Sequence, residues 1–276
     1  MATTPTTSSP SSSSPVGKVA LVAGASRGIG ADTARAFARD GYAVVLGARD
    51  HEALAGVAAD IEQDGGRAVI AVTDVGDTDS MRALVDLAVT TYGRLDAAFN
   101  NATDGPMPGP LADLDPDEFD RGIRTNVRGT FLGMKYEIPA LLASGGGAIV
   151  NMASVAGVRA VTNLAAYVAG KGGIIGLTEV AALDYADRNI RVNVVAPGPI
   201  LTYHLEQAGP EAQRLAGQSV PMGRVGTTDE VADVVLWLCS ERSSFVTGAT
   251  VPIDGGQLAG DKPPQMYRQG EGMART

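Results

Sequence analysis

The sequence predicts an α/β fold in which seven parallel strands form one doubly wound sheet, flanked by helices in a single domain. Apolar, β-branched runs alternate with segments of helical period from residue 18 to about residue 253. Most of these runs are nearly continuous in apolar residues, which is typical of strands in a parallel sheet covered on both faces. The chain has 276 residues, of which 45% are hydrophobic, enough for one large domain with a substantial core.

The apolar runs and the segments between them predict the individual elements. Strands are expected at residues 19–22, 43–46, 68–72, 97–100, 148–151, 191–196 and 250–253. Helices are expected near residues 29–40, 51–64, 77–92, 116–142, 164–188 and 228–239. Strands joined by helical crossovers produce a doubly wound sheet. The longest irregular segment, about 198–227, exceeds a typical connection and is therefore a candidate substrate lid.

The two ends of the chain differ from the domain between them, which we place at residues 17–258. Residues 1–16 are mostly Ser, Thr and Pro, without the apolar core of a secretory signal, and predict a disordered tail. Residues 259–276 are polar and contain glycine. They predict a second tail, either frayed or ordered only against a neighbouring subunit.

Charge and cysteine content exclude several classes of protein. Lys and Arg number 22 and Asp and Glu 31, a net charge of −9, which argues against nucleic-acid or anionic-membrane binding. No apolar stretch is long enough to cross a bilayer, and we expect a cytoplasmic protein. The single cysteine, Cys239, excludes an internal disulfide and lies in an apolar run that favours buried packing. The chain has only two histidines besides this cysteine, and these residues form no convincing cluster of ligands, so no metal site is expected.

A glycine-rich turn joins the first predicted strand to the first predicted helix. Gly24, Gly28 and Gly30 have the spacing Gly-x-x-x-Gly-x-Gly. Glycine allows a tight turn and lets a pyrophosphate approach the backbone N–H groups at the start of a helix. In this position the turn predicts a dinucleotide-binding loop rather than a merely flexible one.

The end of the second predicted strand bears on the choice of dinucleotide. An NAD site would place a carboxylate there to accept the ribose 2′-hydroxyl, whereas this chain has Ala48 and Arg49. Arg27 and Arg49 together suit a 2′-phosphate. Asp50 follows at once and argues for NAD, although we expect its side chain to point away from that of Arg49. The charges favour NADP(H) as the cofactor. The alternatives are that the cofactor is NAD(H), or that Arg27 and Arg49 are two ordinary surface arginines.

Ser154, Tyr167 and Lys171 form the most informative chemical pattern. A phenol and an ammonium four residues apart on a helix share one face, and the ammonium is expected to lower the phenol's pKa from about 10. A hydroxyl at the end of a preceding strand can hold a carbonyl oxygen against the phenol. The set predicts a proton donor for alcohol–carbonyl interconversion. Tyr-x-x-x-Lys alone is mostly a solvated pair, and the upstream dinucleotide loop gives it weight.

Taken in order, these motifs resemble those of the classical short-chain dehydrogenase/reductase family over about residues 17–256. The matching elements are the 24–30 loop, Asp74, Asn100, Asn101, Ala102, Asn126, Ser154, Tyr167, Lys171, Pro197, Gly198, Thr202, Asp254, Gly255 and Gly256. The resemblance implies a Rossmann-type fold and an NAD(P)(H)-dependent oxidoreductase.

The resemblance also implies four catalytic residues. Tyr167 would be the general acid in reduction and the base in oxidation. Lys171 would hydrogen-bond the nicotinamide ribose and lower the Tyr167 pKa, and Ser154 would orient the substrate oxygen. Asn126 would lie at a helix distortion and help a water link Lys171 to solvent.

Cofactor contacts follow from the same resemblance. Asp74 and Val75 would contact adenine, Asn100 and Ala102 would pass beside the cofactor, and residues 197–202 would cover the nicotinamide. The full predicted set is Gly24, Ser26, Arg27, Gly28, Ile29, Gly30, Arg49, Asp74, Val75, Asn100, Ala102, Tyr167, Lys171, Pro197, Gly198, Ile200 and Thr202.

Three positions depart from the family pattern. Ala23 stands where a Thr hydroxyl usually ties the glycine loop to the turn after the fourth strand. Thr103 stands in that turn where Gly is usual, and we interpret it as supplying the missing hydroxyl. Ala153 replaces a common Ser before Ser154. None of the three removes a catalytic group.

The substrate wall is expected from residues 103–111, 155–163 and 198–227. Their apolar side chains favour a neutral, partly apolar ketone or alcohol. Arg159 is interpreted as a solvated loop residue and His204 as a hydrogen-bonded loop histidine. Residues 142–147 carry no positive charge, which argues against an acidic carrier protein as substrate.

The leading hypothesis is therefore an NADP(H)-dependent carbonyl reductase. The alternatives are an NAD-dependent alcohol or sugar dehydrogenase and a non-catalytic dinucleotide-binding scaffold or regulator, against which the four active-site residues argue. Enzymes of this family are mostly tetramers or dimers, so a homotetramer or homodimer built through residues 116–142 and 164–188 is expected. Phe131, Met134, Ile174 and Leu177 are expected on the outward faces of these helices.

Overall fold

The computed structural model describes residues 17–105 and 107–260; the tail predicted at residues 1–16 and the greater part of that predicted at 259–276 lie outside them. All seven strands of its single sheet are parallel, in the order β3-β2-β1-β4-β5-β6-β7. The strands are β1 (Val19–Ala23), β2 (Ala43–Ala48), β3 (Arg67–Val72), β4 (Ala97–Asn100), β5 (Gly147–Met152), β6 (Ile190–Pro197) and β7 (Thr250–Ile253). This confirms the predicted sheet.

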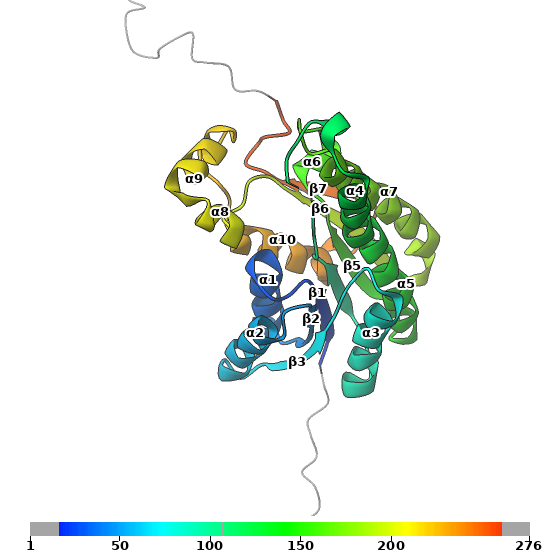
Figure 1. Cartoon of the computed structure of the whole chain (residues 1–276). Coiled ribbons are helices and arrows are strands. Elements are labelled where there is room, and N and C mark those ends of the chain that lie inside the picture. The colour runs from blue at the N-terminus through cyan, green and yellow to red at the C-terminus, as the bar shows by residue number, and fades with distance from the viewer. Residues whose placement is uncertain (1–16, 106, 261–276) are drawn as a thin grey trace, which may run out of the picture.

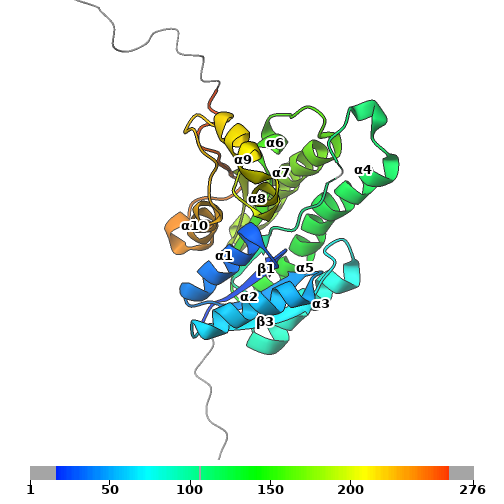
Figure 2. The same ribbon diagram turned by 60° about the vertical axis from the view of Figure 1, so that its left-hand side comes forward.

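Helices cover both faces of the sheet (Figures 1 and 2). One face carries α1 (Gly28–Arg39), α2 (His51–Gln63) and α10 (Thr228–Cys239), with α1 packed on α10. The other carries α3 (Thr78–Tyr92), α5 (Gly129–Ala143) and α7 (Ala165–Tyr185), with α3 packed on α5 and α4 (Pro116–Ile123) on α7. Each face has its own buried apolar cluster, which is why the strands lack an apolar–polar alternation.

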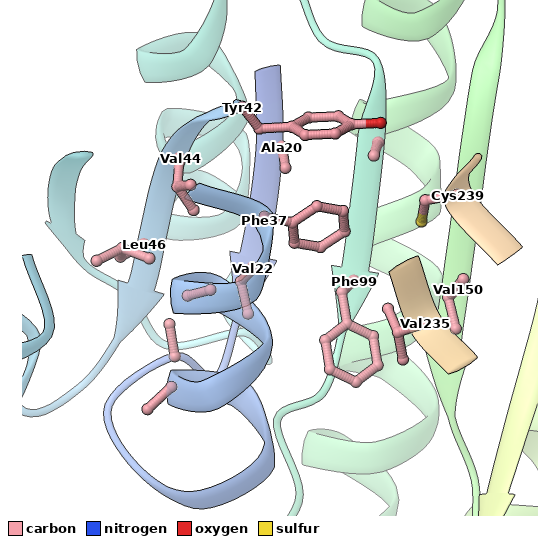
Figure 3. Close-up of a cluster of buried hydrophobic side chains, with 14 of the residues drawn as sticks. Ala20, Val22, Phe37, Tyr42, Val44, Leu46, Phe99, Val150, Val235 and Cys239 are labelled. Atoms are coloured by element: carbon pink, nitrogen blue, oxygen red, sulfur yellow. The ribbon is translucent and has the colours of Figure 1, made fainter. Parts of the chain in front are cut away.

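Figure 3 shows the cluster between the sheet and the α1–α10 pair. Phe37 of α1 and Phe99 of β4 are fully buried in it, and the Phe37 ring packs against Tyr42 with 5.1 Å between ring centroids. Cys239 is buried in the same cluster, as predicted, and burial raises the pKa of its thiol to about 12. This thiol is therefore a packing group.

The helix predicted at residues 116–142 is not continuous. A π-helical turn, η2 (Arg124–Arg128), separates α4 from α5, and Asn126 lies in it with no exposed surface. Single π-helical turns insert a residue and are frequent at functional sites. The distortion lies where the family resemblance placed it.

The segment 198–227 is more regular than predicted. It contains α8 (Tyr203–Gln207) and α9 (Gly209–Gln218); Ala208 lies between them, and Gly209, the first residue of α9, has a φ of 87°. Two short helices broken at a glycine give too few turns for a helical period to emerge. The short helix α6 (Val155–Val158) was missed for the same reason; the 3₁₀ turns are η1 (Leu111–Asp113), η3 (Ala186–Arg188) and η4 (Glu241–Ser243).

The elements beyond the carboxyl ends of the strands define where a ligand can bind. In Figure 1, α8 and α9 stand on one side of this edge of the sheet, and α4 with the segment leading into it stands on the other. Ligands of open parallel sheets bind at this edge, where the strand order reverses. The reversal here lies between β1 and β4.

Candidate active site

The turn between β1 and α1 is shaped for a phosphate-bearing ligand. Gly24 has a φ of 91°, and a Cβ there would lie 2.6 Å from the backbone nitrogen of Ala102. Gly28 has a φ of 54°, and a Cβ on Gly30 would collide with the Gly24 carbonyl oxygen. Among the described residues no side chain caps the N-terminus of α1, and Gly28 and Ile29 of its first turn line the cavity described below. The turn fits the pyrophosphate of a dinucleotide.

Asn101 ties this turn to the chain after β4. Its side-chain Nδ2 donates to the Gly24 carbonyl over 2.8 Å, and the N–H groups of Asn101 and Ala102 both donate to the Ala23 carbonyl over 2.9 Å. The prediction that Thr103 supplies this tie is wrong. The Thr103 hydroxyl points the other way and donates to Asn126 Oδ1 over 2.9 Å.

A cavity of about 580 Å³ runs from the glycine turn to α7. It brings together most of the residues proposed from the sequence. These are Gly24, Ser26, Arg27, Gly28, Ile29, Arg49, Asp74, Val75, Ala102, Ser154, Tyr167, Lys171, Pro197, Gly198, Ile200 and Thr202. The cavity also has lining residues outside the predicted cofactor and catalytic sets. These are Ala48, Asp50, Thr73, Asn101, Thr103, Asp104, Thr125, Met152, Ala153, Tyr203 and His204.

Three of the predicted residues do not line the cavity. Gly30 lies beneath the glycine turn, and Asn126 lies behind the wall formed by Asp104. The Asn100 side chain turns inward, where its Nδ2 donates to Glu137 Oε2 and Asn151 Oδ1, each over 3.0 Å. Asn100 is the last residue of β4 and its side chain points into the protein, whereas Asn101 begins the turn after the strand.

At the cofactor end, Asp50 competes for one of the two predicted phosphate-binding arginines. Arg27 Nη2 lies 3.2 Å from Asp50 Oδ2, and the Arg27 guanidinium lies 5.7 Å from the ring centroid of Tyr203. Asp50 also caps α2 by accepting the Ala53 N–H. We predicted only that Asp50 points away from Arg49; it nevertheless lines the cavity and faces Arg27.

Asp74 is held at the same end by Arg124. The guanidinium donates to both carboxylate oxygens, over 2.9 and 3.3 Å. Partial burial raises the pKa of Asp74, but hydrogen bonds from Arg124 and the Gly76 N–H outweigh it and hold the pKa below its usual value. Asp74 is therefore an ionised acceptor at this end of the cavity.

At the other end, Ser154 and Tyr167 meet. Ser154 follows β5 and caps α6, where its hydroxyl accepts the Ala156 N–H over 3.2 Å and donates to the Pro197 carbonyl over 3.5 Å. Burial raises the pKa of the Tyr167 phenol, and a hydrogen bond with Ser154 only partly opposes this.

Lys171 lies one helical turn further along α7 and is fully buried. Its Nζ donates to the Met152 carbonyl over 2.9 Å and lies 5.5 Å from the Tyr167 ring centroid. Burial lowers the pKa of Lys171 to about 7. The prediction that Lys171 lowers the Tyr167 pKa is wrong for this structure: burial disfavours the charged form of both groups, so the phenol's pKa moves up and the amine's moves down.

The predicted substrate wall is divided between two cavities. Tyr203 and His204 line the first, where their rings pack edge-to-face with 5.9 Å between the ring centroids. His204 lies in α8 and not in a loop. Val155, Val161 and Val220 line a second cavity of about 600 Å³. Arg159, interpreted as solvated, lines this second cavity as well.

Beneath the site, Glu137 is a buried carboxyl whose titration affects stability. It has no exposed surface, and burial raises its pKa from 4.5 to about 8 although Asn100 donates to it. Between those pH values the unfolded chain loses a proton that the folded protein keeps. Folding stability therefore falls as pH rises through this window, by roughly 1.4 kcal/mol per pH unit for this group.

We expect Glu137→Gln to remove that loss. The free energy of unfolding, measured with urea at about pH 5 and pH 8, should fall less with pH in the variant than in the wild type. Equal slopes for the two proteins would contradict a buried, protonated Glu137. Glu179→Gln, at an exposed position on α7, is the matched control.

Within residues 17–105 and 107–260, no group of three or more His, Cys, Asp or Glu side chains is arranged to hold a metal ion. In the same ranges, no helix has both the length and the apolar character needed to cross a membrane.

Comparison with known proteins adds to this geometry. Residues 24–257 match the family model described as enoyl-(acyl carrier protein) reductase. The A-factor type gamma-butyrolactone 1'-reductase (1S-forming) of Streptomyces virginiae is 42% identical over 243 residues, 87% of this chain and 95% of the relative. Cyclohexanol dehydrogenase of Acinetobacter sp. (strain SE19) is 42% identical over 238 residues, 86% of this chain and 94% of the relative. The crystal structure of levodione reductase superimposes with a TM-score of 0.83 at 34% identity, covering 88% of this chain and 98% of that one.

Proposed function

The chain belongs to the short-chain dehydrogenase/reductase family and is an NAD(P)(H)-dependent oxidoreductase of CH–OH and C=O groups. On this basis, we propose that it reduces a cyclic ketone with NADP(H), or oxidises the corresponding secondary alcohol. One observation carries the proposal. A single cavity joins the glycine turn and two arginines at one end to Ser154, Tyr167 and Lys171 at the other.

The catalytic step follows from the positions of three side chains. Bound NADP(H) supplies the hydride in reduction and accepts it in oxidation. The Ser154 hydroxyl holds the substrate oxygen, and the Tyr167 phenol gives that oxygen its proton in reduction and takes it back in oxidation. Lys171, at hydrogen-bond distance from the Met152 carbonyl, keeps a fixed position behind the Tyr167 ring.

A ring-shaped, partly apolar substrate is part of the proposal. Cyclohexanol, named for one relative, is a secondary alcohol on a ring, and a gamma-butyrolactone, named for another, is also a ring. The apolar side chains of Val155, Val161 and Val220 line the second cavity, in which Val155 directly follows Ser154, and they suit such a body. Turnover of cyclohexanone should exceed that of an open-chain ketone with the same number of carbons; equal turnover would contradict the ring preference.

For the cofactor, we propose that Arg49 confers a preference for NADP(H). Arg49 is exposed and lines the cavity, whereas Arg27 is shared with Asp50. A charge-assisted hydrogen bond contributes about 1.5–3 kcal/mol, and an aspartate would add repulsion. Arg49→Asp is therefore expected to raise KM for NADPH by about 30-fold or more while sparing or improving NADH.

The control for this swap is Arg39→Asp, which makes the same change of charge at an exposed position on α1 that does not line the cavity. It should leave both KM values near those of the wild type. An unchanged KM for NADPH in Arg49→Asp would exclude the phosphate-binding role. It would favour the alternative of an NAD-dependent alcohol or sugar dehydrogenase, for which Asp50 is the candidate ribose acceptor.

We also propose that the enzyme is a homotetramer or homodimer associated through α5 and α7. Phe131, Val180 and Leu183 on these helices are exposed apolar side chains, with Leu183 82% exposed. Met134 and Ile174, which we expected on the outward faces, are buried and belong to the core instead. Sedimentation velocity should give a mass of two or four chains, and Leu183→Glu should lower it.

A further inference from the structure

The side chain of Asn126 is fixed by three hydrogen bonds, one of which comes from Thr103. The Thr103 hydroxyl donates to Asn126 Oδ1 over 2.9 Å. Asn126 Nδ2 donates to the carbonyl of Asp104 over 2.5 Å and to that of Gly122 over 2.9 Å. A hydroxyl can give its proton only to the amide oxygen when two carbonyls face the amide nitrogen, so the three partners define one orientation of the amide.

The position of Asn126 relates this network to the catalytic helix. Asn126 lies in the π-helical turn η2 and packs against α7 at Gly170, where an added Cβ would be 3.0 Å from Asn126 Cβ. Gly170 directly precedes Lys171 and lies three residues after Tyr167. The amide is therefore held against the turn of α7 that carries both groups.

The other partners of the Asn126 side chain belong to the wall of the cavity. Thr103 and Asp104 both line the cavity, and an added Cβ on the next residue, Gly105, would lie 3.6 Å from Tyr167 Cδ2. The hydrogen bonds of Asn126 thus connect the backbone that borders the Tyr167 ring to the helix distortion behind it. Asn126 is fully buried, so an amide oxygen deprived of the Thr103 hydroxyl could not turn to solvent instead.

We propose that Thr103 is a positioning residue of this enzyme: its hydroxyl fixes the Asn126 amide and, through it, the wall beside Tyr167. The catalytic consequence rests on the proposed function, whereas the hydrogen bond itself can be tested without turnover.

The first test compares Thr103→Val, which keeps the shape but removes the hydroxyl, with Thr103→Ser, which keeps the hydroxyl. Thr103→Val should lower kcat for ketone reduction about tenfold, because the Asn126 amide beside the wall at Tyr167 loses one of its three partners. NADPH binding should change less than kcat, because the Thr103 hydroxyl bonds to Asn126 and not to the glycine turn or the arginines. Thr103→Ser should restore most of kcat. Equal losses in both variants, or none in Thr103→Val, would overturn the proposal.

The second test is a double-mutant cycle on unfolding by urea, with Thr103→Val, Asn126→Ala and the double variant. Thr103→Val should destabilise the wild type but not a protein that already lacks the Asn126 amide. Simple addition of the two effects would overturn the proposal. This cycle also distinguishes failure of the proposed function from failure of the Thr103–Asn126 contact. An inactive wild type with a non-additive cycle would refute the proposed function and leave the contact in place.

Discussion

Replacing Tyr167 with Phe is expected to lower kcat by about 10²–10⁴-fold, the usual contribution of a positioned acid or base. The change removes only the phenolic oxygen and leaves the ring that packs beside Gly105 and Lys171. Cofactor binding should remain near that of the wild type, since the glycine turn and the arginines lie at the other end of the cavity. Steady-state kinetics and a fluorescence titration with NADPH measure the two quantities.

The pH dependence of the wild type should agree with this assignment. Oxidation uses the phenolate, and burial holds the pKa of Tyr167 above its usual value of 10.0, so the oxidation rate should rise with pH through the neutral and alkaline range. Tyr185→Phe, at the far end of the same helix, should leave kcat unchanged. A kcat within about tenfold of wild type in Tyr167→Phe would mean that another group donates the proton.

Replacing Lys171 with Met should abolish most activity and stabilise the fold at neutral pH. The variant loses the donor behind Tyr167, and loss of one positioned donor typically lowers kcat by about 10²–10³-fold. Burial lowers the pKa of Lys171 from 10.5 to about 7, so in that window the unfolded chain binds a proton that the folded protein does not. Wild-type stability therefore rises as pH rises through the window and is lost as pH falls, by roughly 1.4 kcal/mol per pH unit.

A methionine at position 171 does not titrate, so it adds no pH dependence to the folding stability, and it fills a volume similar to that of lysine. The variant should be more stable than the wild type near pH 7, with the difference shrinking towards pH 10.5, the upper end of the window. Urea unfolding at both ends of the range measures this. A variant less stable than the wild type at every pH would contradict the account of Lys171 as a buried amine retained for function.

The framework of the fold could be predicted from the sequence because the central strands are buried between two helical layers. Burial on both faces selects continuous apolar runs, and such runs marked most of the seven strands. The order of the motifs then placed the glycine turn and Tyr167 at one edge of the sheet, since parallel strands end on the same side.

Features that depend on side-chain direction or on partners distant in sequence were not predictable. Thr103 and Asn126 are 23 residues apart, and Asn126 lies in a π-helical turn that the helical period does not reveal. The inward turn of Asn100 and the pairing of Arg27 with Asp50 likewise depend on the direction in which a side chain leaves the backbone. The direction of the Tyr167 pKa was missed because a spacing of four residues shows the neighbouring charge but not the burial.

The most direct test of the proposed function is to mix the wild type or Tyr167→Phe with NADPH and cyclohexanone, following the absorbance of the reduced nicotinamide and the cyclohexanol formed. We predict that the wild type converts ketone to alcohol with one NADPH oxidised per alcohol, and that Tyr167→Phe binds NADPH yet forms almost none. Binding of NADPH or NADH by the wild type without reduction of any cyclic ketone, or oxidation of any cyclic alcohol, would contradict the proposal and favour a dinucleotide-binding scaffold.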